Sequence, residues 1–101
     1  MAVHPRKDLD GVIHAPVRFS IVAALAVVDE VDFKTLAETI DVSDSAMSKH
    51  LSVLTEAGYI APRKTFVGKF PRTYVSLTTA GRKAWERHVA ALREIAGLTE
   101  P

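Results

Sequence analysis

Residues 42–60, VSDSAMSKHLSVLTEAGYI, place a helix start, a helical repeat of apolar residues and a helix stop in one short stretch. Ser43 can act as an N-cap, because its hydroxyl can accept a hydrogen bond from a free N–H group of the first turn. Apolar side chains then recur at i, i+4 and i+7, the spacing of one helix face, and they are Met47, Leu51 and Leu54. Gly58 stands where helices commonly end. The stretch predicts a helix over residues 44–57.

A second, shorter helix is predicted just before this one. Asp32 can cap it through its carboxylate. Four apolar residues then recur at helical spacing, namely Phe33, Leu36, Ala37 and Ile40. Asp41 and Val42 leave room only for a tight turn before the next helix. Two short helices joined by a tight turn are the arrangement of a helix-turn-helix unit.

The pattern changes after Gly58, where β-branched and aromatic residues become frequent. Residues 59–67 and 72–77 are predicted to be strands, and Gly68-Lys69-Phe70-Pro71 is predicted to be the loop between them. A helix-turn-helix unit followed by a basic hairpin is the order of elements in a winged helix-turn-helix protein.

Apolar helices flank this unit on both sides. In the first, over residues 17–28, only Arg18 and Ser20 are polar. A helix that is apolar nearly all round must be covered nearly all round, so we expect a partner subunit to cover part of it. Thr78 can cap the last helix, over residues 79–96. Its apolar face consists of Trp85, Val89, Leu92 and Ala96.

The 101 residues are enough for a single domain with one hydrophobic core. We expect residues 1–8 to be a flexible arm, residues 9–78 to form the helical core and the wing, and residues 79–97 to form a dimerisation helix. Leu9, Val12 and Ile13 are expected to form one short helical turn that ends at Pro16. Gly81, near the start of the last helix, is expected to let another backbone approach closely.

Charge is unevenly distributed along the chain, although the net formal charge is only +1. Between Asp29 and Asp44 there are six acidic residues and a single base, Lys34. From Gly58 to Lys83 there is no acidic residue, and there are six bases. Such asymmetry favours a surface with one positive side, as nucleic-acid partners prefer, although ordinary solvated charge would give the same pattern.

Several classes of site have no support in the sequence. Cysteine is absent, so neither a disulfide nor a thiolate metal site is expected. Glu86 and His88 could both ligate a metal, but no second histidine follows at helical spacing, so no metal is expected. Without a phosphate loop or a nucleophile motif, we expect no catalytic residues, no cofactor and no enzyme. No apolar run approaches the ~18 residues of a membrane span, and we expect a cytoplasmic protein without membrane contact.

The helix over residues 44–57 carries a polar face opposite its apolar stripe. Small hydroxyl groups allow close approach to base edges in a major groove, and a lysine can reach guanine or phosphate. The residues expected to contact DNA from this helix are Ser43, Ser45, Ala46, Ser48, Lys49 and Ser52. Those expected to contact DNA from the wing are Arg63, Lys64, Lys69 and Arg72. The residues expected between two copies of the chain are Phe19, Val22, Trp85, Val89, Leu92 and Ile95.

Residues 42–60 resemble the recognition helix and first wing strand of ArsR- and MarR-type transcription regulators. Leu77-Thr78-Thr79-Ala80-Gly81-Arg82 is similar to the segment that closes the wing and opens the dimerisation helix in that superfamily. Residues 13–19 resemble the first helical region of its small members. The resemblance, over residues 9–96, implies a mainly α winged helix-turn-helix fold with a three-helix core, a two-stranded wing and a C-terminal dimerisation helix. It also implies a homodimer whose recognition helices enter successive major grooves of double-stranded DNA.

Two features depart from that superfamily. ArsR-type metal sensors use cysteines near the recognition helix, and this chain has none. A MarR-type wing often carries an aspartate before its arginine, whereas Phe70-Pro71 precede Arg72 here. We therefore expect the geometry of the wing to differ.

The predicted function is sequence-specific binding of double-stranded DNA by a homodimeric transcription regulator, acting as a repressor. A winged-helix module that binds protein and no longer binds DNA is an alternative, but Lys49 and the acid-free stretch argue against it. RNA binding is a third hypothesis, which the charge of the hairpin leaves open. The sequence identifies no small-molecule or protein effector.

Overall fold

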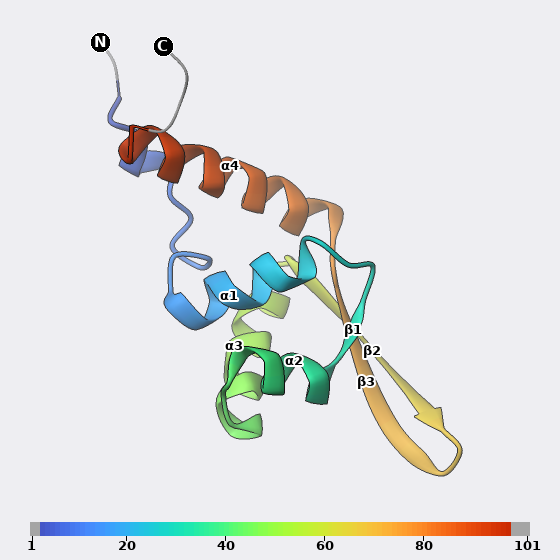
Figure 1. Cartoon of the computed structure of the whole chain (residues 1–101). Helices are drawn as coiled ribbons and strands as arrows, with labels where there is room; N and C mark the ends of the chain where they lie inside the picture. Colours follow the sequence, from blue (N-terminus) through green and yellow to red (C-terminus); the bar gives the residue numbers. More distant parts are fainter. Residues whose placement is uncertain (1–2, 98–101) are drawn as a thin grey trace.

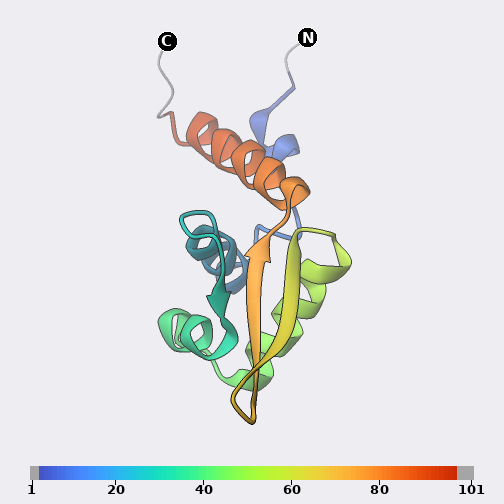
Figure 2. The same ribbon diagram turned by 90° about the vertical axis from the view of Figure 1, so that its right-hand side faces the viewer.

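The computed structural model describes residues 3–97. Its elements follow one another as η1 (Pro5–Asp8, a 3-10 helix), α1 (Pro16–Leu25), β1 (Val31–Asp32), α2 (Phe33–Ile40), α3 (Asp44–Glu56), β2 (Ile60–Val67), β3 (Phe70–Leu77) and α4 (Thr79–Ile95). The strands form one antiparallel sheet in the order β1-β3-β2. Helices α1, α2 and α3 lie together beside this sheet, α4 crosses one end of the molecule, and the β2–β3 hairpin extends from the other end (Figures 1 and 2). The predicted winged helix-turn-helix fold is confirmed, with one additional short strand.

The hydrophobic core lies where α1, α2 and α3 meet the sheet. Each element contributes side chains with almost no exposed surface, among them Ile21, Val22, Leu25, Leu36, Met47, Leu54 and Val75. Burying one such side chain contributes roughly 1.5–3 kcal/mol to folding. The predicted inner stripe of α3 is confirmed, because Met47, Leu51 and Leu54 are its buried residues. The opposite face of α3 must therefore point away from the core.

Side-chain caps fix where three of the helices begin. Each predicted cap accepts a hydrogen bond from a backbone N–H of the first turn: Asp32 from Thr35 (3.1 Å), Ser43 from Ala46 (3.1 Å) and Thr78 from Gly81 (2.9 Å). Between α2 and α3, Asp41 takes a φ of 61°, which gives the chain its tight turn. The predicted starts of α2, α3 and α4 are thus confirmed, and so is the turn between α2 and α3.

Helix α1 is shorter than predicted, because it ends at Leu25 and not at Val28. The chain then turns so that Val31 and Asp32 can pair with β3 as strand β1. Val27 lies in this turn with 83% of its surface exposed. The polar segment before α2, predicted only as a break, therefore contributes a strand, and reaching β3 requires the helix to stop early.

The loop of the hairpin is also shorter than predicted. Val67 pairs with Phe70 and Phe66 pairs with Pro71, so Phe70 and Pro71 belong to β3. Only Gly68 and Lys69 form the turn. Gly68 has a φ of 64°. Two-residue hairpin turns need such a backbone conformation, which glycine adopts without steric cost.

The predicted N-terminal arm contains a helix that the sequence did not indicate. Element η1 packs against α4 (Figure 1). Asp8 accepts a hydrogen bond from the Arg87 guanidinium at 2.9 Å. The predicted short helical turn before Pro16 is present as a single turn over residues 10–14. The His14 N–H donates to the Asp10 carbonyl at 2.7 Å, and Asp10 Oδ1 accepts from the N–H groups of Val12 and Ile13. Residues 1–2 of the predicted arm, and residues 98–101 of the predicted domain, lie outside the described residues.

Helix α4 begins where predicted and ends one residue earlier. Its buried residues are Gly81, His88 and Ala91. Trp85, Val89 and Leu92 of the predicted apolar face are half-buried, and Ala96 is exposed. The side of α4 that the chain covers completely is therefore the one with Gly81, His88 and Ala91. The predicted apolar face is only half covered.

Candidate nucleic-acid interface

The outward face of α3 carries an exposed polar stripe. Ser45, Ser48, Lys49 and Ser52 are all exposed, and their spacing of three or four residues places them on one side of the helix. A helix of 13 residues is about 20 Å long at ~1.5 Å per residue, a suitable length for a major groove. Four predicted contact residues are thus brought together on an accessible surface.

Two other residues predicted to contact DNA from α3 have structural roles. Ser43 caps the helix through its hydroxyl, and Ala46 is half-buried. The Ser52 hydroxyl donates to the Ser48 carbonyl at 3.0 Å, so its oxygen remains able to accept a hydrogen bond. No ion pair within residues 3–97 involves Lys49. Its ammonium group is therefore available to an external anion.

The two faces of the hairpin carry different residues, because directly paired residues of antiparallel strands project to the same side. Lys64 pairs with Thr73 and Pro62 with Val75, which is completely buried, so these residues share the face toward the helices. A cleft of about 570 Å³ separates this face from α3. Its lining includes Ser48, Ser52, Lys64 and Thr73. Lys64 is thus brought to the same cleft as the stripe of α3.

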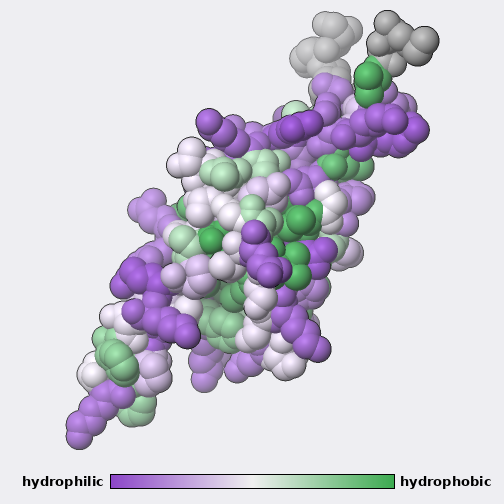
Figure 3. All heavy atoms as spheres, turned by 180° about the vertical axis from the view of Figure 1, so that it is seen from behind, coloured by the Kyte–Doolittle hydropathy of each residue, from purple (hydrophilic) through white to green (hydrophobic). Residues whose placement is uncertain are grey.

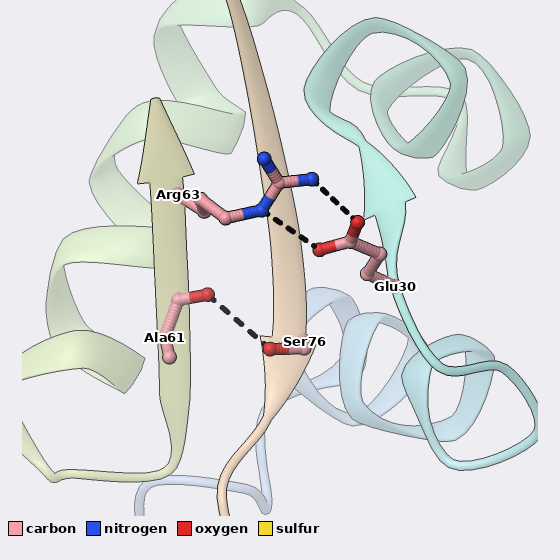
Figure 4. A network of polar contacts seen from close by, with 4 residues as sticks. All are labelled: Glu30, Ala61, Arg63 and Ser76. Atoms are coloured by element: carbon pink, nitrogen blue, oxygen red, sulfur yellow. Dashed lines mark hydrogen bonds and ion pairs between the residues drawn. The ribbon is translucent and has the colours of Figure 1, made fainter. Parts of the chain in front are cut away.

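Arg63 lies on the opposite face of the hairpin, where it forms an ion pair within its own chain. Its guanidinium donates to both carboxylate oxygens of Glu30, at 2.6 and 3.4 Å (Figure 4). It also lies 4.8 Å from the centre of the Tyr74 ring. The Glu30 carboxylate also raises the pKa of Arg63. The local pairing satisfies the arginine and ties β2 to the segment before β1.

The two remaining predicted wing contacts differ in their surroundings. Lys69 sits in the turn of the hairpin, and no ion pair in the described part of the chain involves it. Arg72 approaches the N-cap of α2. The pKa of Asp32 is lowered chiefly by the hydrogen bonds from Thr35, and the positive charge of Arg72 lowers it further. Neither residue has an acidic neighbour in the sequence. In the folded chain, however, Arg72 lies near Asp32, whereas Lys69 has no ion pair within the described residues.

Apolar side chains at the tip of the hairpin were not singled out together from the sequence. Phe66, Val67 and Phe70 are all exposed. In the space-filling view, apolar atoms gather near the free end of the wing with hydrophilic atoms around them (Figure 3). The sequence does contain a feature that indicates this cluster. At Phe66-Val67 the alternation of polar and apolar residues breaks, and two large apolar residues follow one another next to a turn.

The residues predicted to lie between two copies fall into two groups. Val22 has 0% of its surface exposed and belongs to the core of its own chain, so its assignment to the interface is wrong. Phe19, Trp85, Val89 and Leu92 are half-buried, and Ile95 is 43% exposed. The Phe19 and Trp85 rings lie 5.0 Å apart between α1 and α4. An apolar hollow of about 200 Å³ beside them is lined in part by Phe19 and Leu92.

His88 is a buried polar side chain of α4. Its Nδ1 accepts a hydrogen bond from the Asp10 N–H at 2.9 Å, and its Nε2 has no partner within the described residues. Burial, together with the nearby His14, lowers the pKa of His88. Asp10 also accepts a 2.5 Å hydrogen bond from the Tyr59 hydroxyl. This network, which was not predicted, connects α4 with the junction of α3 and β2.

Residues 3–97 contain no group of three side chains able to hold a metal ion, and no helix among them is long and apolar enough to cross a membrane. The surface that stands out is the one formed by α3 and the hairpin. The start of α3 and the tip of the hairpin lie at the same end of the molecule, and α4 lies at the opposite end (Figures 1 and 2).

Residues 17–96 match the family described as winged helix DNA-binding domain. A relative, the uncharacterized protein MJ0432 of Methanocaldococcus jannaschii, is 24% identical over 84 residues, which cover 83% of this chain and 91% of the relative.

The fold is similar to that of a transcriptional regulator homologue from Pyrococcus horikoshii, with a TM-score of 0.86 and 24% identity over 97% of this chain and 100% of the other. It is also similar to the transcriptional regulator MosR of Mycobacterium tuberculosis, which was solved in complex with DNA. That match has a TM-score of 0.70 and 20% identity, and covers 93% of this chain and 64% of MosR. At these identities the similarity shows a shared fold.

Proposed function

The chain belongs to the family of winged helix DNA-binding domains, and we propose on that basis that it is a homodimeric transcription regulator that recognises a specific sequence in double-stranded DNA. The observation that carries the proposal is the exposed stripe of Ser45, Ser48, Lys49 and Ser52. It lies on a helix held rigidly by the core, beside a hairpin whose exposed face toward it carries Lys64.

The stripe fits direct readout of bases better than simple charge attraction. The Ser45 and Ser48 hydroxyls and the Lys49 ammonium group can donate hydrogen bonds to base edges, the Ser52 oxygen can accept one, and the short serines keep the helix close to the groove floor. Arg18 of α1 supports α3 from behind, because its Nε donates to the Val12 carbonyl at 2.6 Å and its guanidinium lies 3.3 Å from Nδ1 of His50. A rigid support of this kind favours specific over adaptable contacts.

The proposed dimer interface is the apolar surface at the α4 end of the molecule. Phe19, Trp85, Val89 and Leu92 are only half covered by their own chain, and Ile95 is 43% exposed. A second copy packed there by two-fold symmetry would bury these side chains and point both α3 helices the same way. The DNA site would then be a pseudo-palindrome with half-sites ~34 Å apart, one helical turn.

We propose repression and not activation, because a bound dimer represses simply by excluding another protein from the same DNA. Such a regulator acts in the compartment that holds the DNA, which is the cytoplasm in a cell without a nucleus.

In vitro selection of duplexes with the purified protein tests the proposal. We expect enrichment of a pseudo-palindrome bound by two chains, as measured by sedimentation of the complex. Duplex RNA and single-stranded DNA should compete poorly for the same protein. A protein that fails to bind any duplex DNA at low salt would instead support the alternative of a protein-binding module.

A further inference from the structure

The tip of the wing exposes three large apolar side chains that nothing else in the described residues covers. Phe66 is 71% exposed, Val67 47% and Phe70 76%. They flank the two-residue turn, and Val67 pairs directly with Phe70. Neighbouring apolar groups left in water bring no benefit to folding, and such clusters commonly mark a binding surface.

The register of the hairpin places the two phenylalanines on opposite faces. Phe70 shares its face with Val67, and Phe66 shares the other face with Pro71. Because side chains alternate along a strand, Lys64 lies two residues behind Phe66 on the same face, and Arg72 lies two residues behind Phe70 on its face. Each cation is thus set back by about 7 Å from its phenylalanine, at ~3.3 Å per residue. Lys69 lies in the turn itself.

We propose that this apolar tip enters the minor groove of the bound duplex as a wedge, with Phe70 partly unstacking one base step and bending the DNA. The proposal rests on the proposed function and adds to it how the wing is used. An apolar edge with cations behind it on both faces is complementary to DNA, where stacked bases lie between two rows of phosphates.

The position of the tip favours DNA over other partners. It lies at the same end of the molecule as the start of α3, so one duplex can meet both (Figures 1 and 2). Apolar wedges are a recognised way of opening a base step from the minor groove, and pyrimidine–purine steps open most easily. We therefore expect the site of insertion to be such a step, outside the bases read by α3.

The experiment uses the selected duplex, labelled at its ends for energy transfer and carrying 2-aminopurine at successive steps. We expect wild-type protein to bring the ends closer and to raise 2-aminopurine fluorescence at one step in each half-site. Phe70→Ala should reduce the fluorescence change at least threefold and should reduce the bend. Phe70→Leu should retain most of both, because an apolar wedge remains.

Phe70→Lys separates a wedge from a simple charge contact. If the tip only senses phosphate charge, the added cation should tighten binding in low salt. If Phe70 acts as a wedge, the DNA bend and the 2-aminopurine signal should be lost, and this is the result we expect. Val27→Ala, which removes another exposed apolar group away from the wing, is the matched control and should change neither signal. The melting temperature of each variant shows whether folding is intact.

Three outcomes would overturn the inference. The first is wild-type protein that binds its selected duplex with no bend and no 2-aminopurine signal. The second is a Phe70→Ala variant with an unchanged bend. The third is wild-type protein that binds vesicles of anionic phospholipid through Phe70 while Phe70→Ala leaves the DNA signals intact, since the tip would then face a membrane. Failure of wild-type protein to bind any duplex would contradict the proposed function itself.

Discussion

Gly81 of α4 lies directly against the backbone carbonyl of Tyr59, so that a methyl group on Gly81 would overlap with that oxygen. Next to this contact, the Thr78 N–H donates to the same carbonyl at 3.0 Å and the Thr78 hydroxyl donates to the Gly58 carbonyl at 2.6 Å. The end of α3, the first strand of the wing and the start of α4 are thus joined at one point. A change at this point would shift α4 relative to α3 and the hairpin.

We expect Gly81→Ala to destabilise the protein by about 1–3 kcal/mol, because the added methyl group has no room. Helix propensity alone predicts the opposite sign, since alanine is favoured over glycine by ~1 kcal/mol within a helix. The free energy of unfolding in urea measures the outcome. Gly11→Ala is the matched control, because a Cβ at Gly11 meets nothing within 4 Å. Gly81→Ala protein of equal or higher stability would contradict the packing described here.

Lys49→Ala should relax sequence preference at one or two base pairs of the site, at a cost of roughly 1–3 kcal/mol, if this side chain reads a base edge. The measurement is the affinity for the selected site and for single-base variants of it. Lys83→Ala removes one exposed lysine from α4, at the other end of the molecule, and should leave the preference unchanged. Identical selectivity of Lys49→Ala and wild-type protein would move base readout to other residues.

Replacing Lys69 and Arg72 with alanine should weaken binding to all duplexes by a similar factor, because phosphate contacts carry no sequence information. The slope of log affinity against log salt should fall by about 0.9 for each phosphate that the double variant no longer neutralises, with both subunits included. Lys69 should contribute more than Arg72, whose charge is partly balanced by Asp32.

Arg63→Ala is the control for that double variant. Its guanidinium is paired with Glu30 within the chain, so its loss should leave the salt slope unchanged. Exposed ion pairs contribute at most ~1 kcal/mol to stability, and the fold should tolerate the change. A slope that falls more with Arg63→Ala than with the double variant would show that Arg63 neutralises phosphates in place of Lys69 and Arg72.

His88 should make the protein sensitive to mild acid. Burial lowers its pKa in the folded state, so below the ordinary value of 6.5 the unfolded chain takes up a proton that the folded chain does not. Stability is therefore lost as the pH falls from about 6.5 toward the lowered pKa. The groups facing His88 are Asp10, His14 and Phe19. We expect the melting temperature to drop between pH 7 and pH 5.

His88→Gln should flatten this dependence, whereas His4→Gln at the exposed N-terminal segment should leave it intact. Asp32 affects stability in a separate pH range. Its pKa is lowered from the ordinary value of 3.8, so its stabilising effect is lost only as the pH falls below that value. An unaltered pH profile in His88→Gln would show that another group is responsible.

Ile95→Lys tests the proposed interface between two copies. Ile95 is 43% exposed in the single chain, so a lysine there should leave the fold intact, and a cation near the end of a helix is electrostatically favourable. We expect the sedimentation of Ile95→Lys to shift toward the monomer and its affinity for the full palindrome to fall. Val28→Lys, a similar change in the turn after α1, is the control. A stable Ile95→Lys dimer would place the interface elsewhere.

The sequence by itself determined the features that depend on residues close together in the chain. Asp32, Ser43 and Thr78 cap helices because each can reach an N–H group three residues ahead. The inner stripe of α3 follows from helical spacing, and its outward polar stripe follows from the same geometry. The match of residues 17–96 to a DNA-binding family agrees with this local interpretation.

Only the tertiary structure decided the features that join distant parts of the chain. Strand β1 exists because Val31 pairs with Val75, and that pairing also ends α1 early. Alternation along β2 shows that Arg63 and Lys64 lie on opposite faces of the hairpin. It does not show which of these faces lies toward the helices. Val22 was likewise predicted to lie between two copies of the chain, but other elements of its own chain cover it completely. A periodic pattern defines a face from neighbouring residues, whereas what covers that face depends on contacts between residues far apart in sequence.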